Sequence, residues 1–262
     1  MNRLQAACRR ALCLPIRAYQ HTLSPWIGRS CRFTPSCSNY TMQAILTHGC
    51  IKGILLGAWA PVADARRVLD IGTGSGLIAL MLAQRSTNDC RIDGVELDKD
   101  AAEQARDNVA ASPWASRVTI IENAIQDYQA VPYDLIVSNP PYFLAGQVLS
   151  DPARALARHT GALGPHALLA ASRRLLSQHG RLALVLPTAM ADEILCISAD
   201  YDLYSLCYTA VITREGKEAN RVLLLLGRGL SRCEQGEIVI HSTAGGYSDR
   251  YIQLTHPFYL KM

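Results

Sequence analysis

The 262-residue chain lacks any long hydrophobic run, so a membrane-spanning helix is not expected. Its longest nearly uncharged apolar stretch, Ile54–Ala63, is about half of the ~20 residues that such a helix needs. Cysteine is also scarce, because nine residues are far fewer than a disulfide scaffold contains. We therefore expect buried, reduced cysteines and a cytoplasmic protein. No secretory signal is expected, because the apolar segment 11–16 is short and no small-residue cleavage site follows it.

Acidic residues are absent from residues 1–60, where seven Arg and Lys residues give a formal charge of +7. The remaining 202 residues contain 19 bases and 22 acids and carry −3. Five of the nine cysteines also lie in the first quarter of the chain. This asymmetry predicts two units: a basic helical segment over residues 1–53 that suits an anionic partner, and a second domain over residues 54–262.

From Arg67 onward, short β-rich runs alternate with helical patterns, which is typical of a parallel sheet covered by helices. Strands are expected at Arg67–Ile71, Arg91–Glu96, Arg117–Ile121, Asp134–Ser138 and Arg181–Leu186, and helices at Leu77–Gln84, Lys99–Ala110 and Gly161–Gln178. Two further β-rich runs, Leu203–Thr213 and Asn220–Leu226, predict an antiparallel hairpin at the sheet edge. The expected fold class is α/β and Rossmann-like, with a mostly parallel sheet of seven strands.

A glycine-rich turn, Asp70-Ile-Gly-Thr-Gly-Ser-Gly76, follows the first expected strand. Glycines let the backbone turn tightly and approach a ligand at the start of the next helix. The spacing G-x-G-x-G differs from the dinucleotide fingerprint G-x-G-x-x-G, which favours a ligand without a pyrophosphate. Glu96 ends the second expected strand and is placed to accept hydrogen bonds from both hydroxyls of a ribose. The pattern predicts a nucleoside site.

The fourth expected strand ends in Asn139-Pro-Pro-Tyr142, at the edge where open α/β sheets bind ligands. Two prolines make this corner rigid and remove two backbone donors, so it presents carbonyl acceptors. The Asn139 side-chain oxygen and the Pro140 carbonyl can accept both hydrogens of an exocyclic amine. Tyr142 offers a face on which a flipped base can stack. A stiff loop is the simpler structural alternative.

These motifs resemble the S-adenosylmethionine-dependent N-methyltransferases of the Rossmann-like class through Asp70–Gly76, Val95–Asp98 and Asn139–Tyr142. Residues 53–262 resemble more closely the tRNA adenine-N6-methyltransferases that modify the base after the anticodon of valine tRNA. That resemblance rests on Leu55–Pro61, on Val68–Ala83 and on the C-terminal segment 247–262. It implies methyl transfer from S-adenosylmethionine to the amine of adenine 37 of valine tRNA.

The resemblance also implies roles for individual residues. The cofactor would be bound by Asp70, Gly72, Gly74, Gly76 and Glu96, and the target amine by Asn139, Pro140, Pro141 and Tyr142. The family often has an acid near the adenine of the cofactor. This chain has Ala124 at that place, so Asn123 or the backbone amides are expected there instead.

Candidate tRNA contacts are cations that follow the Asn139 motif or lie around the hairpin loop: Arg154, Arg158, His159, Lys217 and Arg221. Such cations bind phosphates and fix position rather than sequence. Because the larger domain carries −3, the +7 segment can supply the basic surface that a tRNA enzyme needs. No metal site is expected, since Cys31 and Cys37 are six apart and no second close pair exists.

The N-terminal quarter resembles the membrane protein insertion efficiency factors over residues 10–53, through Cys31–Tyr40 and His48–Gly53. Apolar residues at three- to four-residue steps predict a basic amphipathic helix, which can lie on an anionic membrane or pack on the protein itself. The second half of that family's pattern is absent. The segment that precedes Gly53 in the methyltransferases is also absent.

Three functions remain open from the sequence. The first is S-adenosylmethionine-dependent methylation of an adenine amine in tRNA, which requires no metal or general base. The second keeps the cofactor and changes the acceptor to a guanine amine or a protein glutamine. The third is a membrane-surface accessory factor with an inactive methyltransferase body, peripheral to the inner face of the membrane.

Overall fold

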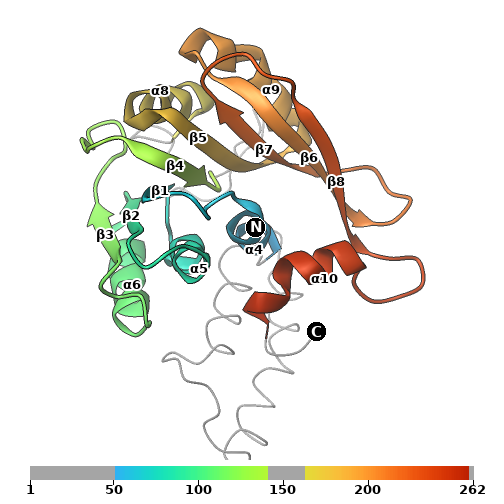
Figure 1. Cartoon of the computed structure of the whole chain (residues 1–262), viewed down its shortest axis with the longest axis horizontal. Helices are drawn as coiled ribbons and strands as arrows, with labels where there is room; N and C mark the ends of the chain where they lie inside the picture. Colours follow the sequence, from blue (N-terminus) through green and yellow to red (C-terminus); the bar gives the residue numbers. More distant parts are fainter. Residues whose placement is uncertain (1–50, 141–162, 260–262) are drawn as a thin grey trace, which may run out of the picture.

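Eight strands form one twisted sheet in the computed structural model, which describes residues 51–140 and 163–259 (Figure 1). The strands are β1 (Arg67–Ile71), β2 (Arg91–Glu96), β3 (Val118–Glu122), β4 (Tyr133–Ser138), β5 (Leu176–Pro187), β6 (Tyr204–Arg214), β7 (Arg221–Gly227) and β8 (Glu234–His241). The helices are α4 (Ile51–Trp59), α5 (Leu77–Arg85), α6 (Lys99–Ala110), α8 (Pro165–Leu175), α9 (Thr188–Ser198) and α10 (Asp249–Thr255). Two short 3-10 helices follow, Ala199–Tyr201 after α9 and His256–Phe258 after α10.

The order β3-β2-β1-β4-β5-β7-β6-β8 confirms the α/β class. The first five strands in this order run parallel. In β1 every residue after Arg67 is buried, because helices cover both faces of a central parallel strand. This burial explains the continuous apolar run from which the strand is predicted in the sequence. The expected bounds of β1, β2 and α6 match the structure.

The antiparallel half of the sheet differs from the expectation. β7 pairs antiparallel with both β5 and β6, so the expected hairpin is present. It does not form the edge, however, because β8 pairs parallel with β6 and brings the sheet to eight strands rather than seven. Charged and polar residues fill much of β8, where only Ile238 and Ile240 are buried. An edge strand of this composition gives a weak sequence signal.

Two helices also differ from the prediction. α9 was not predicted at all, and the helix expected over residues 161–178 runs only from Pro165 to Leu175 in the described residues. Leu176 is extended, with φ −77° and ψ 138°, because it pairs with Tyr133 of β4 and so begins β5. The strand pairing ends a helix that the apolar pattern alone would continue.

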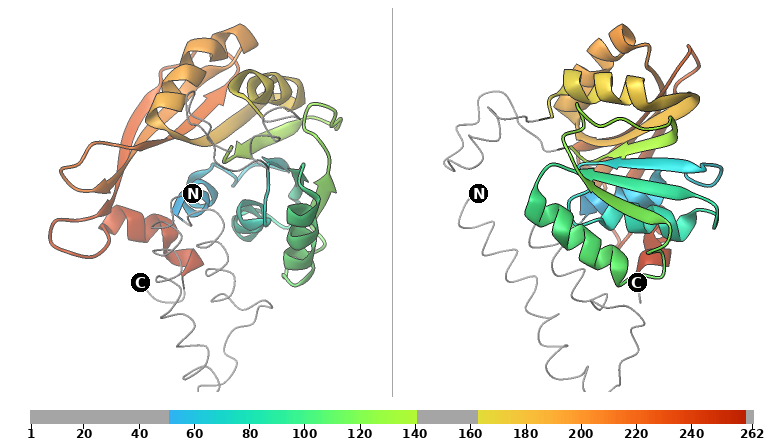
Figure 2. Two further views of the ribbon diagram at one scale, coloured as in Figure 1. Left: turned by 180° about the vertical axis from the view of Figure 1, so that it is seen from behind. Right: turned by 90° about the vertical axis from the view of Figure 1, so that its left-hand side faces the viewer.

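Helices lie on both faces of the sheet, as Figures 1 and 2 show. α4, α5, α6 and α10 cover one face, and α8 and α9 cover the other. Each face has its own buried cluster: one contains Leu56 and Leu82, and the other contains Leu169 and Ile194. The site described below therefore rests on a sheet that is packed on both sides.

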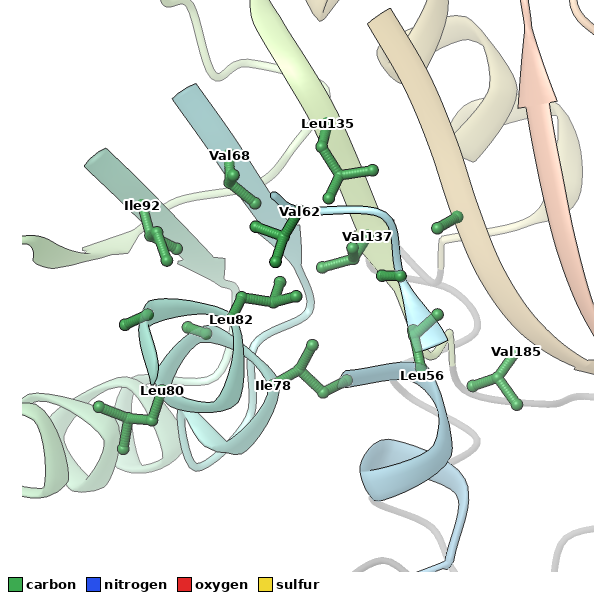
Figure 3. Packing of buried hydrophobic residues seen from close by; sticks show 14 of the residues in the cluster. Leu56, Val62, Val68, Ile78, Leu80, Leu82, Ile92, Leu135, Val137 and Val185 are labelled. Carbon is green, nitrogen blue, oxygen red and sulfur yellow. The ribbon is translucent and has the colours of Figure 1, made fainter. Parts of the chain in front are cut away.

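α4 belongs to the core of this α/β body. Leu55 and Leu56 are fully buried, and Leu56 lies in one cluster with Ile78 of α5 (Figure 3). Gly57 approaches α5 so closely that a Cβ placed on it would lie 2.8 Å from Met81 Sδ. The helix from Gly53 onward is thus part of the hydrophobic core that packs on one face of the sheet.

Cysteine burial corrects one expectation. The four cysteines in the described part of the chain are free thiols, and Cys90 is buried, as expected of a small apolar residue. Cys196 is exposed on α9, and Cys207 and Cys233 are half-buried, so the expectation of buried cysteines was wrong for these three. Over residues 51–140 and 163–259, no helix has the length and apolarity needed to span a bilayer.

Candidate cofactor and substrate site

The strand register brings the predicted site residues to one edge of the sheet. Ile71, the last residue of β1, pairs with Val95 on one side and with Ser138 on the other. The residues that follow these three are Gly72, Glu96 and Asn139. The glycine turn therefore lies between Glu96, which is predicted to bind the ribose, and Asn139, which is predicted to bind the amine. Glu96 in turn pairs with Glu122 of β3, which places Asn123 at the same edge.

The glycine turn adopts a backbone conformation that is unfavourable for residues other than glycine. Gly72, Gly74 and Gly76 have φ values of 69°, 55° and 79°, all in the left-handed region where L side chains are strained. The N–H groups of Gly72 and Thr73 donate to the Val95 carbonyl, at 2.9 and 3.2 Å. Among residues 51–140 and 163–259, nothing lies within 4 Å of the position of a Cβ on Gly72, so this part of the structure leaves space there for a ligand to approach.

Glu96 holds this turn through its carboxylate. Oε2 accepts from Gly74 N at 2.8 Å, and Oε1 accepts from the N–H groups of Leu97 and Asp98, at 2.9 and 3.0 Å. A carboxylate offers about four acceptor positions, so one remains, on Oε2. Glu96 can therefore accept a ribose hydroxyl on Oε2 without giving up its bonds to the turn.

Asp70 is fully buried beneath the turn. Its Oδ2 accepts from Thr73 Oγ1 at 2.7 Å. Burial raises the pKa of Asp70 to about 7, although the Thr73 hydroxyl and the Ala79 amide lower it, and the charge of Glu96 raises it further. Within the described residues, Oδ1 has no hydrogen bond of normal geometry.

The Glu96 carboxylate, together with the ionised form of Asp70, makes this site suitable for a cation. Ion pairs in the described residues join Arg67 to Asp93, Arg106 to Glu122 and Arg173 to Asp202, and none of them involves Asp70 or Glu96. S-adenosylmethionine carries a sulfonium and an ammonium group, so its charge complements this pair of acids. The open space at Gly72 and the unpartnered oxygen of Asp70 also fit a bound ligand.

The end of β4 is tied directly to the end of β1. Ser138 is fully buried, and its hydroxyl donates to the Ile71 carbonyl at 2.8 Å. Asn139 is half-buried and Pro140 is buried. Pro141 and Tyr142 lie outside the described residues, as do Arg154, Arg158 and His159. The structure therefore places the first half of the predicted amine site beside the glycine turn.

The predicted adenine side of the site lies at the end of β3. Asn123 N donates to the Glu96 carbonyl at 3.0 Å, and both Asn123 and Ala124 are half-buried. The following turn is fixed from α8 by Arg174, whose guanidinium donates to the carbonyls of Ile125, Gln126 and Tyr128. Asn123 and Ala124 are thus on a rigid turn next to Glu96.

Leu97 is a further candidate for the site, and no role is predicted for it from the sequence motifs. It follows Glu96 directly, and 56% of its surface is exposed, which is unusual for a leucine in this protein. An apolar side chain next to a ribose ligand can cover the face of a purine. The signal was an apolar residue placed between two acids just after a buried strand.

The two described cations from the hairpin lie at different distances from Asn139. Arg221 begins β7 opposite Pro187, the last residue of β5, so it is at the same sheet edge two strands away. Lys217 is exposed in the β6–β7 turn, beyond the end of the sheet. Residues 51–140 and 163–259 contain no cluster of His, Cys, Asp or Glu side chains that could hold a metal ion.

Two family models match parts of the chain. Residues 54–196 match the methyltransferase small domain, and residues 8–60 match the membrane protein insertion efficiency factor family. The two matches overlap in α4. Among solved structures, a protein from Agrobacterium tumefaciens described as a predicted O-methyltransferase has a TM-score of 0.62 and 20% identity, covering 79% of this chain and 96% of that one. This likeness supports the fold alone.

Curated relatives are far more similar in sequence. The tRNA1(Val) (adenine(37)-N6)-methyltransferase of Aeromonas salmonicida is 80% identical over 210 residues, which cover 80% of this chain and 89% of the relative. The protein of the same name from Tolumonas auensis is 48% identical and covers 80% and 88% of the two chains. The sequence, the fold and the shared edge of Gly72, Glu96 and Asn139 agree: this chain belongs to the family of the tRNA1(Val) (adenine(37)-N6)-methyltransferases.

Proposed function

We propose that this chain transfers the methyl group of S-adenosylmethionine to the N6 amine of adenine 37 in valine tRNA. The observation that carries the proposal is the register at the end of β1, which sets the Gly72 turn directly between Glu96 and Asn139. A cofactor site and an amine site are thereby adjacent on one rigid sheet edge. Relatives with this named activity are 80% and 48% identical to the chain.

On the cofactor side, residues of the chain bind S-adenosylmethionine and orient it. Bound S-adenosylmethionine supplies an electrophilic methyl group on a sulfonium. Glu96 accepts a ribose hydroxyl through the remaining position on Oε2 while its other acceptor positions keep the turn in place. The carboxyl groups of Asp70 and Glu96 favour a cationic ligand, and Asn123 with Ala124 borders the adenine.

On the substrate side, Asn139 and Pro140 hold the amine. The Asn139 side-chain oxygen and the Pro140 carbonyl accept its two hydrogens, which aims the nitrogen lone pair at the methyl carbon. As the N–C bond forms, the C–S bond breaks, and the proton lost from nitrogen goes to water, so no general base is needed. Tyr142 is proposed to stack on the flipped adenine and Pro141 to stiffen the corner.

The basic N-terminal segment is proposed to contact the tRNA backbone. A Cβ on Gly53 would lie 3.4 Å from Leu77 Cδ2, and Leu77 is the first residue of α5, directly after Gly76. Gly53, which follows residues 1–52 in the sequence, therefore lies next to the first residue after the cofactor turn. Residues 1–52 carry the charge of +7, and Arg154, Arg158, His159, Lys217 and Arg221 are proposed to add phosphate contacts around the same edge. A tRNA substrate places the enzyme in the cytoplasm.

The direct test is methylation by the purified full-length chain. Incubation with S-adenosylmethionine and unmodified tRNA, followed by digestion and mass spectrometry, should yield N6-methyladenosine. Asn139→Ala should abolish the product while leaving cofactor binding unchanged. Methylated guanine in place of adenine, or methylated glutamine in a protein substrate, would contradict the proposed acceptor.

The match of residues 8–60 to the insertion efficiency factors favours a second candidate, a peripheral contact of the N-terminal segment with an anionic membrane. Cosedimentation with vesicles of phosphatidylglycerol at low salt tests it. The full-length chain should sediment with these vesicles and not with neutral ones, and a chain that lacks residues 1–50 should stay in solution. Equal behaviour of the two chains would exclude this role.

A further inference from the structure

Asn108 is the one polar residue among the four buried residues of α6, a helix that the structure describes in full. The others are Ala102, Ala105 and Val109. A buried amide costs free energy unless it finds a partner. Here Nδ2 of Asn108 donates to the Ser75 carbonyl at 2.9 Å, inside the glycine turn and 33 residues away in the sequence.

The packing of α6 makes this long-range contact possible. Ala105 precedes Asn108 by three residues and so lies on the same face of the helix. Its Cβ would be 3.4 Å from a Cβ placed on Gly76, which is van der Waals contact. The small Ala105 lets the helix approach the turn, and the longer Asn108 then reaches the backbone carbonyl.

The contact fixes one peptide unit of the turn at both ends. The carbonyl of Ser75 accepts from Asn108, and the N–H of the same peptide, on Gly76, donates to the Thr73 carbonyl at 2.9 Å. Glycines allow a peptide plane to rotate at little cost, so a turn with three glycines depends on contacts from outside. Glu96 supplies one at Gly74, and Asn108 supplies another at Ser75.

We infer that Asn108 is a positioning residue for S-adenosylmethionine. It acts through the backbone of the turn and does not touch the ligand. The inference rests on the proposed function, which assigns residues 72–76 to the cofactor. A turn that is already held in place loses less conformational entropy when the cofactor binds, so Asn108 contributes to affinity rather than to the methyl transfer step.

Calorimetric titration of the full-length protein with S-adenosylmethionine tests this inference. Asn108→Ala should raise the Kd about tenfold. Asn108→Asp should raise it further, because an ionised carboxylate only accepts hydrogen bonds and would face the Ser75 carbonyl. At saturating cofactor, kcat should remain within about twofold of the wild-type value, since only the binding of the cofactor is affected.

Val109→Ala is the matched control. It removes buried volume at the next position of the same helix, so it lowers thermal stability without changing a contact to the turn. Its Kd should equal that of the wild type. The inference is wrong if the wild type binds the cofactor and both Asn108 variants bind it with the same Kd. It is also wrong if their loss of affinity is no larger than that of Val109→Ala. Neither result contradicts the proposed function. Absence of cofactor binding by the wild type overturns the proposed function and the inference with it.

Discussion

At the scale of single residues, substitutions at Gly72 and Gly216 distinguish the cost of backbone strain from the loss of space for a ligand. Gly72 and Gly216 both have φ near 70° to 80°, and both have open space around the position of a Cβ. An alanine at either position should therefore cost about 1–2 kcal/mol of stability, from backbone strain alone. Only Gly72→Ala also fills space at the cofactor site, so only this variant should lose cofactor affinity.

Thermal melts and calorimetric titration of the two alanine variants check this prediction. Similar losses in Tm should accompany a cofactor Kd at least tenfold higher for Gly72→Ala and an unchanged Kd for Gly216→Ala. Equal Kd values in the two variants would show that Gly72 does not approach the ligand.

Asp70 links stability to pH. Its pKa is about 7 in the folded protein against 3.8 for an exposed aspartate, so the folded state binds the proton more tightly. This stabilisation is fully present below about pH 4 and is lost as the pH rises to about 7. Asp70→Asn does not titrate. The free energy of unfolding of the wild type, minus that of the variant, should therefore fall between pH 4 and 7, by at most about 1.4 kcal/mol per pH unit.

Urea unfolding of the two cofactor-free proteins at several pH values measures that difference. Other titrating groups are common to both proteins and cancel. A difference that stays constant from pH 4 to 7 would mean that Asp70 is ionised throughout, against the burial that the structure shows.

The sequence predicts which residues lie at the candidate site better than it predicts the hydrogen-bond partners of those residues. The strand ends placed Asp70, Glu96 and Asn139 correctly at one edge, because parallel strands end together. The bond from Gly74 to the Glu96 carboxylate and the bond from Asn108 to Ser75 depend on how loops and helices pack. These contacts join residues 22 and 33 positions apart, so they leave no local pattern in the sequence.

At the scale of elements, strongly periodic segments were predictable and the edge of the sheet was not. β1, β2 and α6 matched their expected bounds because burial on one or both faces imposes a clear apolar pattern. β8, at the edge of the sheet that the described residues form, alternates poorly because few of its positions are buried. Leu176 shows the other failure, in which pairing with Tyr133 overrides a helical pattern.

The contact between α4 and α5 gives a prediction at this scale. Gly57→Ala would place its Cβ 2.8 Å from Met81 Sδ and 3.0 Å from Met81 Cβ, so the helices must shift, at a cost of about 1–3 kcal/mol. Met81→Ala removes the obstructing atoms, and the double variant should be more stable than the sum of the two single losses implies. A double-mutant cycle by urea unfolding measures this coupling. Additive losses would contradict the close approach of the two helices.

At the scale of the whole molecule, the chain combines a basic segment with a body that carries a small negative charge. Removing residues 1–50 deletes six arginines and leaves α4 intact. The shortened chain should fold and bind S-adenosylmethionine with unchanged affinity. It should bind tRNA more weakly, and the logarithm of its binding constant should depend less steeply on the logarithm of salt concentration, since each phosphate contact contributes ~0.7–0.9 to that slope.

Filter binding at several salt concentrations compares the two chains. A full-length variant with the six arginines replaced by glutamine serves as the control, because it keeps the segment and removes its charge. It should behave like the shortened chain. An unchanged salt slope in both proteins would show that the N-terminal segment does not contact the tRNA.

The most direct measurement uses two transcripts of tRNA1(Val), one with adenine and one with guanine at position 37. The full-length chain and S-adenosylmethionine are added to each, and the anticodon-loop fragment is analysed by mass spectrometry. We expect one methyl group on the fragment that contains adenine 37, recovered as N6-methyladenosine, and none on the guanine transcript. Cofactor binding without methylation of the adenine transcript, or methylation at another position, would contradict this expectation.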